Sequence, residues 1–367
     1  MAASARSTLR RLPALLAWAV ALFVLLEGSA RLLLFGRAGL SPARVNSVRG
    51  LPQAGFTQPS PEPRLAFELR PNLDGWFKLV PFRTNAQGLR DGPYALAKPP
   101  STFRVAVVGS SFALPAGVAI EAAFHSRLEE RFSRELAPLR FEFLNFAVGM
   151  YNPEQVLAML ELRALAWDPD LVLMTGTRLS LPWLVGDPRS AEGRAVRRLD
   201  PEALPSFRRS YPVLQSFLFQ LARARLGLAP PSPAPCGLER LAVAVSERLA
   251  PPPRPARRTA GRPPPPAGSV IERFARLGRE RGVPVALVLL EFEDRARVAL
   301  DARVAAEARA HGVPYLDTRD AFRGTRARDF WIYELDPHPN ARAHAVFAEA
   351  VATFLRSNGL LPMPPRP

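Results

Sequence analysis

Short apolar runs alternate with longer amphipathic segments over most of the chain. Each run has the length and β-branched content of a buried strand, and each following segment repeats its apolar residues at helical spacing. This alternation predicts an α/β domain with a parallel sheet between layers of helices. The predicted strands are Val105–Val108, Phe141–Phe146, Asp170–Thr175, Val283–Leu290 and Val313–Asp317, and the predicted helices are Ala122–Leu136, Pro153–Ala166, Val270–Arg281, Arg295–Ala310 and Ala341–Arg356.

The N-terminal segment is apolar and follows a basic tip. Leu12–Leu26 contains no charged residue, and Glu27 and Arg31 then form an i,i+4 pair before a second apolar piece that ends near residue 36. Together the two pieces are long enough to span a bilayer, so residues 1–36 predict an uncleaved membrane anchor. The small residues Gly28–Ala30 leave a cleaved signal peptide as the alternative. In both cases the basic tip stays cytoplasmic and the rest of the chain is exported.

The polar and apolar pattern also divides the chain into regions. Residues 37–82 are rich in proline and glycine and predict a tether with a small edge structure, including a hairpin over Phe67–Leu79. Residues 83–357 form the predicted main domain, and residues 358–367 a short tail. The strand-helix pattern breaks over residues 181–268, which we interpret as a surface insertion that ends in a Pro/Arg-rich linker.

Composition narrows the partners and the chemistry. The net charge is +16, but lysine occurs only at Lys78 and Lys98, and the arginines are scattered, which argues against a nucleic-acid surface and leaves anionic lipid as a partner. The single cysteine, Cys236, cannot form an internal disulfide. His125 and His344 lie within predicted helices and are expected to be structural. No group of residues has metal-ligand spacing, so neither a metal nor another cofactor is expected.

Two serines stand where the first predicted strand ends. Ser110 and Ser111 directly follow Val105–Val108 and Gly109, at the edge where open parallel sheets bind their ligands. A serine in such a turn exposes its hydroxyl near backbone amides that stabilise an anion. The alternative is that both serines only cap a helix. A nucleotide site is disfavoured because the turn lacks a glycine-rich phosphate loop.

An Asp-x-His pattern precedes the last predicted helix. Asp336 can fix the ring of His338 through Nδ1, which leaves Nε2 to accept a proton from a serine. Because a βα domain brings both ends to one rim of its sheet, Ser111, His338 and Asp336 predict a nucleophile, a base and its orienting group. The alternative is a helix-capping Asp336 beside a surface histidine.

Several blocks, taken in order, resemble the SGNH/GDSL hydrolase superfamily. Their order and spacing carry the resemblance, which spans residues 83–180 and 268–357. The blocks are Val105–Phe112 with Gly117-Val118, Asn145–Asn152, Pro169–Thr177, and Asp336–Asn340 with Ala343-His344. Asn85–Asp91 also resembles the lead-in of exported, membrane-anchored members.

The resemblance implies a flavodoxin-like three-layer sandwich with a parallel sheet, the SGNH hydrolase fold. It also implies that Ser111 is the nucleophile, that His338 and Asp336 serve it, and that the Ser111 amide donates to the oxyanion. An acyl-enzyme on Ser111 would pass its acyl group to water or to a sugar hydroxyl. The implied function is a membrane-anchored serine esterase or O-acyltransferase for acyl esters, including acetyl esters of envelope carbohydrate, on the exported side.

The oxyanion positions depart from the family. Met150 stands where the second-block glycine is usual, unless the turn shifts to Gly149, and Arg178 replaces the third-block asparagine. Arg178 could donate to the oxyanion or contact an anionic substrate. Loss of one oxyanion donor typically costs about 10²–10³ in rate. The alternative function is therefore a catalytically weakened binding or scaffold protein of the envelope.

Overall fold

A computed structural model describes residues 2–46, 48, 55–186, 217–226, 268–293 and 298–362. Its central sheet has five strands, all parallel, in the order β6-β5-β7-β8-β9. In chain order this is 2-1-3-4-5, the flavodoxin-like arrangement, so the predicted α/β fold with a parallel sheet between helices is confirmed. The strands are β5 Thr102–Val108, β6 Arg140–Asn145, β7 Leu171–Gly176, β8 Val285–Leu289 and β9 Tyr315–Asp317.

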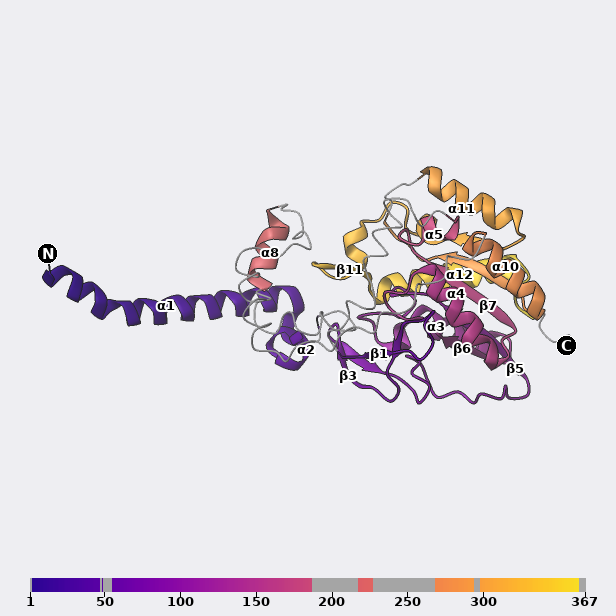
Figure 1. Cartoon of the computed structure of the whole chain (residues 1–367), viewed down its shortest axis with the longest axis horizontal. Coiled ribbons are helices and arrows are strands. Elements are labelled where there is room, and N and C mark those ends of the chain that lie inside the picture. Colours follow the sequence, from indigo (N-terminus) through magenta and orange to yellow (C-terminus); the bar gives the residue numbers. More distant parts are fainter. Residues whose placement is uncertain are drawn as a thin grey trace.

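Helices flank this sheet in two groups (Figure 1). One group packs α3 against α12, and the other packs α10 against α4 and α11. Their bounds are α3 Phe124–Glu135, α4 Pro153–Leu162, α10 Val270–Arg281, α11 Val298–Ala310 and α12 Ala341–Ser357. Val105–Val108 of β5 and the whole of β7 are buried because helices cover them, which is why these stretches are apolar throughout most of their length and do not alternate.

Local side chains explain where three of these helices begin. Asn152 and Gln155 form a reciprocal capping box at the start of α4. Ser269 accepts from the amide of residue 272 at the start of α10, and Asn340 accepts from two amides at the start of α12. Asn340 directly follows the Asp-x-His segment, so this cap fixes where α12 begins relative to His338.

Three small antiparallel pairs lie outside the central sheet. β1 Thr57–Pro59 pairs with β2 Phe67–Leu69, β3 Asp74–Phe77 with β4 Val80–Arg83, and β10 Trp331–Tyr333 with β11 Asp336–Pro339. The hairpin expected over residues 67–79 is therefore displaced along the chain. Its turn is Lys78-Leu79, where both residues have positive φ (47° and 73°), as a two-residue hairpin turn requires.

Helix α1, Ala2–Phe35, extends away from the rest of the protein (Figure 1). Within the described chain, Pro13–Leu40 is the one segment long and apolar enough to cross a membrane. Where we expected a tether, a 3-10 turn (Gly36–Leu40) and the short helix α2 (Pro42–Asn46) fold back beside the end of α1.

The expected insertion over residues 181–268 is described only in part. Its first residues form α5, Leu181–Leu184, whose side chains are buried in the main domain. A second piece forms α8, Phe217–Arg225, which packs on α1. The Pro/Arg-rich linker and Cys236 lie outside the described residues.

Candidate active site

The loop after β5 places Ser110 and Ser111 at the carboxyl edge of the sheet, and both are partly exposed. Gly109 is required there because a Cβ on it would lie 1.9 Å from the hydroxyl oxygen of Thr175 on the neighbouring strand. The next helix, α3, begins only after Ala123, which has no side-chain cap. The helix-cap interpretation of the two serines is therefore wrong, and their hydroxyls are left at the strand end.

Asp336 and His338 form a close pair on β11. His338 Nδ1 lies 2.5 Å from Asp336 Oδ1, and the backbone amide of His338 donates to the same oxygen at 3.0 Å. The pair is stiffened because β11 is held by its pairing with β10. The alternative, a helix-capping Asp336, is wrong, since Asn340 caps α12. With Nδ1 donating to Asp336, Nε2 of His338 is the nitrogen left to accept a proton.

Two further side chains hold the other carboxylate oxygen, and sequence reasoning missed both. Lys78, from the β3–β4 turn, places Nζ 2.6 Å from Asp336 Oδ2 and 3.0 Å from His338 Nδ1. Tyr333 donates its hydroxyl to Asp336 Oδ2 at 3.2 Å. The only signal in the sequence was the rarity of lysine in a chain whose basic residues are almost all arginine.

Burial and charge set the protonation of this cluster. Burial lowers the pKa of His338, the hydrogen bond to Asp336 raises it, and the charge of Lys78 lowers it further, with a net downward shift. Burial acts to raise the pKa of Asp336, but the bond from His338 and the charge of Lys78 outweigh it and hold the pKa well below its usual range. The cluster therefore pairs a carboxylate with a neutral histidine near pH 7, the state needed for a base.

The serine loop meets the histidine hairpin through its neighbours. The ring of Phe112, next in chain to Ser111, lies 5.7 Å from the ring of His338. Gly117 of the same loop has φ +79°, and a Cβ there would lie 2.7 Å from Ile332 of β10. The structure brings Ser111 and His338 to one edge, and none of the described hydrogen bonds joins them directly.

The turn after β6 carries the second-block residues. The amide of Val148 donates to Gly109 O at 3.1 Å, which places this turn beside the serine loop. The residue in the left-handed region is Met150, at φ +75°, and Gly149 is not among the residues with positive φ. Within the described chain the amides of Gly149, Met150 and Ser111 donate to no protein acceptor.

Arg178 follows β7 but is held by other groups. Its Nη1 lies 2.8 Å from Oε2 of the buried Glu293, and its amide donates to Glu291 at 3.3 Å. Phe292, between these two glutamates, stacks on Phe112 with ring centroids 5.9 Å apart. Arg178 thus lies near the serine loop with its guanidinium engaged in an ion pair.

The lead-in segment, Asn85–Asp91, holds the loop that carries Ser111 through hydrogen bonds. Arg90 is 1% exposed and donates to the carbonyl oxygens of Leu114, Pro115 and Val118. Asp91 Oδ2 accepts from the amide of Asn145 at 2.8 Å. The segment therefore connects the end of β6 to the loop that carries Ser111.

The remaining histidines do not reach this site. His125 and His344 are 1% and 0% exposed, and burial lowers the pKa of each to about 3. His344 Nδ1 accepts from the amide of Phe124 at 3.3 Å, a structural role. The side chain of His311 is 28% exposed and lies 3.4 Å from Glu307.

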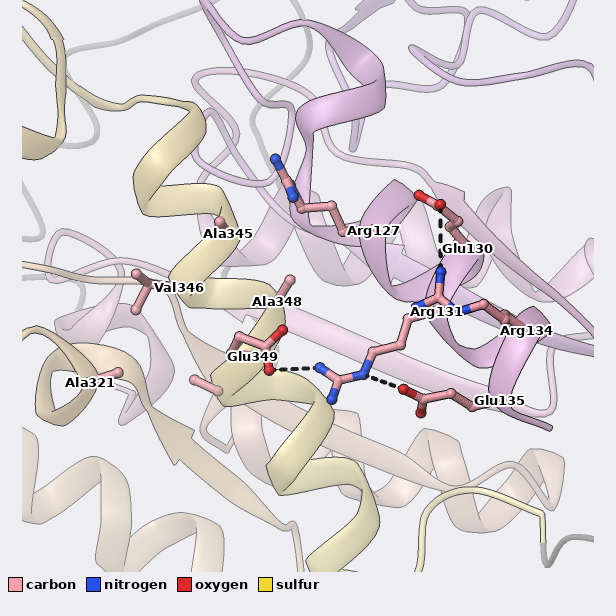
Figure 2. A pocket seen from close by; sticks show the side chains of 11 residues that line it. Arg127, Glu130, Arg131, Arg134, Glu135, Ala321, Ala345, Val346, Ala348 and Glu349 are labelled. Atoms are coloured by element: carbon pink, nitrogen blue, oxygen red, sulfur yellow. Dashed lines mark hydrogen bonds and ion pairs between the residues drawn. The ribbon is translucent and has the colours of Figure 1, made fainter.

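A surface groove between α3 and α12 is separate from the Asp336–His338 cluster (Figure 2). Arg131 there bonds Glu349 and Glu135, and Arg134 pairs with Glu130. The groove contains none of the Asp336–His338 cluster, and its charges neutralise one another. Among the described residues there is also no group of His, Cys, Asp and Glu side chains arranged to hold a metal ion.

No family model and no curated protein sequence matches the chain. Its fold is similar to solved esterase structures at low identity. These include a two-domain esterase (CEX) active on acetylated mannans, at 14% identity and TM-score 0.40 over 72% of this chain and 52% of that one. A variant of Axe2, an acetyl xylan esterase from Geobacillus stearothermophilus, matches at 13% identity and TM-score 0.39 over 71% and 96%. TesA matches at 14% identity and TM-score 0.38, over 69% of this chain and 98% of that one.

This chain therefore spans about half the length of the two-domain mannan esterase. At such identities and TM-scores the likenesses carry no argument about chemistry. The functional argument below comes from the site itself.

Proposed function

We propose that the protein is an SGNH-type serine ester hydrolase or acyltransferase. Ser111 is the nucleophile, His338 its general base and Asp336 the group that orients the histidine. The observation that supports this best is the Asp336–His338 pair, 2.5 Å apart, on a hairpin that packs against the loop of Ser111. A neutral histidine with a fixed Nδ1–H and a free Nε2 is what activation of a serine hydroxyl requires.

The reaction proceeds in two steps, acylation of Ser111 and transfer of the acyl group to an acceptor. The Ser111 oxygen attacks the ester carbonyl carbon while its proton moves to His338 Nε2, and the tetrahedral oxyanion is stabilised by free amides at Ser111 and at Gly149 or Met150. The carbon–oxygen bond to the alcohol then breaks, and the alcohol leaves with the proton from His338. Water, or a sugar hydroxyl, next attacks the acyl carbon of the acyl-serine while its proton moves to His338 Nε2. The bond between the acyl group and Ser111 then breaks, Ser111 takes that proton from His338, and the carboxylic acid, or the new ester, leaves.

A second candidate function is a binding or scaffold protein that has kept the fold and lost turnover. The engagement of Arg178 by Glu293 favours it, because the residue at the third-block donor position is turned to an ion pair. The Asp336–His338 geometry opposes it, since a binding module has no use for a histidine held by a carboxylate. We therefore place the esterase or acyltransferase first.

We also infer that α1 is retained as a membrane anchor, with the main domain on the exported side. Glu27 is 7% exposed and accepts hydrogen bonds from the amides of Phe217 and Leu218, which begin α8. Ala30 and Phe35 are buried as well. Cleavage at Gly28–Ala30 would remove a capping group and expose the end of α8, so retention fits the packing better than a signal peptide does.

The test uses the full chain in detergent with a fluorophosphonate probe and p-nitrophenyl acetate. Wild-type protein is expected to be labelled and to hydrolyse the ester, and Ser111→Ala to lose labelling. His338→Ala should lower kcat by at least about 10⁴-fold. Ser110→Ala and His311→Ala are matched controls and should retain activity. Absent labelling in folded wild-type protein would overturn the enzyme proposal. Acetyl esters of envelope carbohydrate are the first natural substrates to test.

A further inference from the structure

We propose that this site works on acyl esters carried by a membrane lipid. The hairpin that holds Asp336 and His338 is packed against the end of the apolar helix α1, so the catalytic edge of the sheet faces the bilayer surface. The proposal builds on the esterase or acyltransferase function above and names the kind of molecule that presents the ester.

The outer part of α1 is an apolar surface that no described part of the chain covers. Its large exposed side chains are Leu15, Leu16, Trp18, Val20, Leu22, Phe23, Val24, Leu25, Leu26, Leu32 and Leu33. A patch of this size on a soluble surface would cause aggregation, and a bilayer is the medium that accommodates it. Leu33 is still 79% exposed, so the lipid-facing surface continues almost to the end of the helix.

Two residues after Leu33 the helix enters the body of the protein. The ring of Phe35 lies 5.0 Å from that of Phe217 on α8 and 5.2 Å from that of Tyr333 on β10, both edge to face. We call the group around it the anchor cluster. Its members are Phe35, Val45 and Phe217, with Leu34, Val48, Leu79 and Tyr333 packed on them.

The anchor cluster reaches the catalytic carboxylate in two ways. Tyr333 packs its ring in the cluster and donates its hydroxyl to Asp336 at 3.2 Å. Leu79 packs in the cluster, and the preceding Lys78 binds Asp336 at 2.6 Å. Both groups that hold Asp336 from outside β11 therefore come from residues in, or next to, the anchor cluster. An ion pair between Arg225 of α8 and Glu334, 2.9 Å apart, is a third contact that holds the β10–β11 hairpin.

These contacts set the height of the site above the bilayer. From Leu33 to Phe35 the helix rises about 3 Å, whereas the interfacial layer is roughly 5–8 Å deep on each side. Tyrosine rings such as that of Tyr333 are favoured in this layer. Exposed leucines also lie at the ends of the two elements that pack on α1: Leu40 closes the 3-10 turn, and Leu226 directly follows α8. An ester held in the headgroup layer therefore lies level with the catalytic edge.

The net charge of the protein and the local concentration of a lipid-borne ester also favour a lipid substrate. A chain with a net charge of +16 is attracted to anionic lipid. A lipid-borne ester in the same bilayer meets the site by diffusion in two dimensions, so its effective concentration exceeds that of a dissolved ester. We expect the ester bond at the headgroup to be attacked by Ser111, and the lipid alcohol to leave with the proton from His338.

For the experiment, the full chain is reconstituted in vesicles that contain phosphatidylcholine and one-fifth phosphatidylglycerol. The probe is a dialkyl glycerol lipid whose headgroup carries an acetyl ester, placed either in the same vesicles as the protein or in separate ones. p-Nitrophenyl acetate, which is dissolved, serves as the second substrate. We expect the lipid ester to be cleaved at least tenfold faster in the shared vesicles, with equal rates on p-nitrophenyl acetate in both arrangements. Ser111→Ala should abolish both reactions.

A matched pair of variants tests the role of the anchor cluster. Phe35→Ala should reduce the shared-vesicle advantage at least threefold, and Leu16→Ala, in the middle of the helix, should not. Two outcomes would overturn this proposal and leave the esterase function standing. In both, p-nitrophenyl acetate is hydrolysed, and the lipid ester is either cleaved at equal rates in shared and separate vesicles or not cleaved at all. Loss of both reactions in folded wild-type protein would overturn the two together.

Discussion

The ammonium group of Lys78 lies 2.6 Å from Asp336 Oδ2, although the two residues are 258 positions apart in the chain. Lys78 is 9% exposed, and its pKa is lowered because burial outweighs the attraction of Asp336. The carboxylate is thus shared between a cation and the ring of His338. A negative charge that is partly neutralised in this way raises the basicity of the histidine less than a lone carboxylate would.

Replacing Lys78 with methionine should shift the pH dependence of the reaction. Because the charge of Lys78 lowers the pKa of His338, its removal raises that pKa. More of the histidine is then protonated at a given pH, and protonated His338 cannot act as a base. The acid limb of the profile of kcat/KM against pH should therefore move upward by roughly one unit. Initial rates with p-nitrophenyl acetate between pH 5 and 9 measure this shift.

Lys98→Met is the control for this prediction, since Lys98 is the only other lysine and pairs with Asp168 and Asp170 away from the site. It should leave the limb in place. A Lys78→Met enzyme with reduced kcat but an unmoved acid limb would mean that Lys78 only supports the hairpin.

Arg178→Ala should lower kcat less than tenfold. The guanidinium is bound to Glu293 at 2.8 Å, so it is not directed at the oxyanion, whose donors we place in the backbone. Removal of a true oxyanion donor costs about 10²–10³ in kcat. Steady-state kinetics of Arg178→Ala beside Arg163→Ala, a surface arginine paired with Glu68, distinguish the two cases. A loss above a hundredfold at Arg178 alone would return this residue to the oxyanion site.

The sheet was predictable from the sequence because its strands are buried on both faces and therefore read as apolar runs. The helix predicted over Val270–Arg281 has the observed bounds, since a serine caps its start and a left-handed Gly282 ends it. Asp336 and His338 were also predictable, because two residues of spacing place both on one short segment. None of these predictions needed a contact between distant parts of the chain.

What escaped prediction depends on such contacts. Lys78 stands in a hairpin turn whose approach to Asp336 is set by the packing of Leu79 on the end of α1, and no periodicity encodes that packing. The pair Glu27–Arg31 was predicted and is observed at 3.0 Å, but no local pattern indicated that Glu27 also accepts from the first amide of α8. Arg178 was found by position, and its partner Glu293 lies after another strand.

Arg90→Met should destabilise the fold because three backbone carbonyl oxygens of the serine loop lose their donor. Leaving a buried acceptor unsatisfied costs about 1–3 kcal/mol, so we expect the free energy of unfolding to fall by roughly 3 kcal/mol or more. Urea unfolding of the full chain in detergent measures this as a lower midpoint. Arg83→Met is the matched control, since Arg83 is 75% exposed and pairs only with the exposed Asp74. Equal midpoints for the two variants would show that the loop holds its conformation without Arg90, and that the lead-in segment supports something other than Ser111.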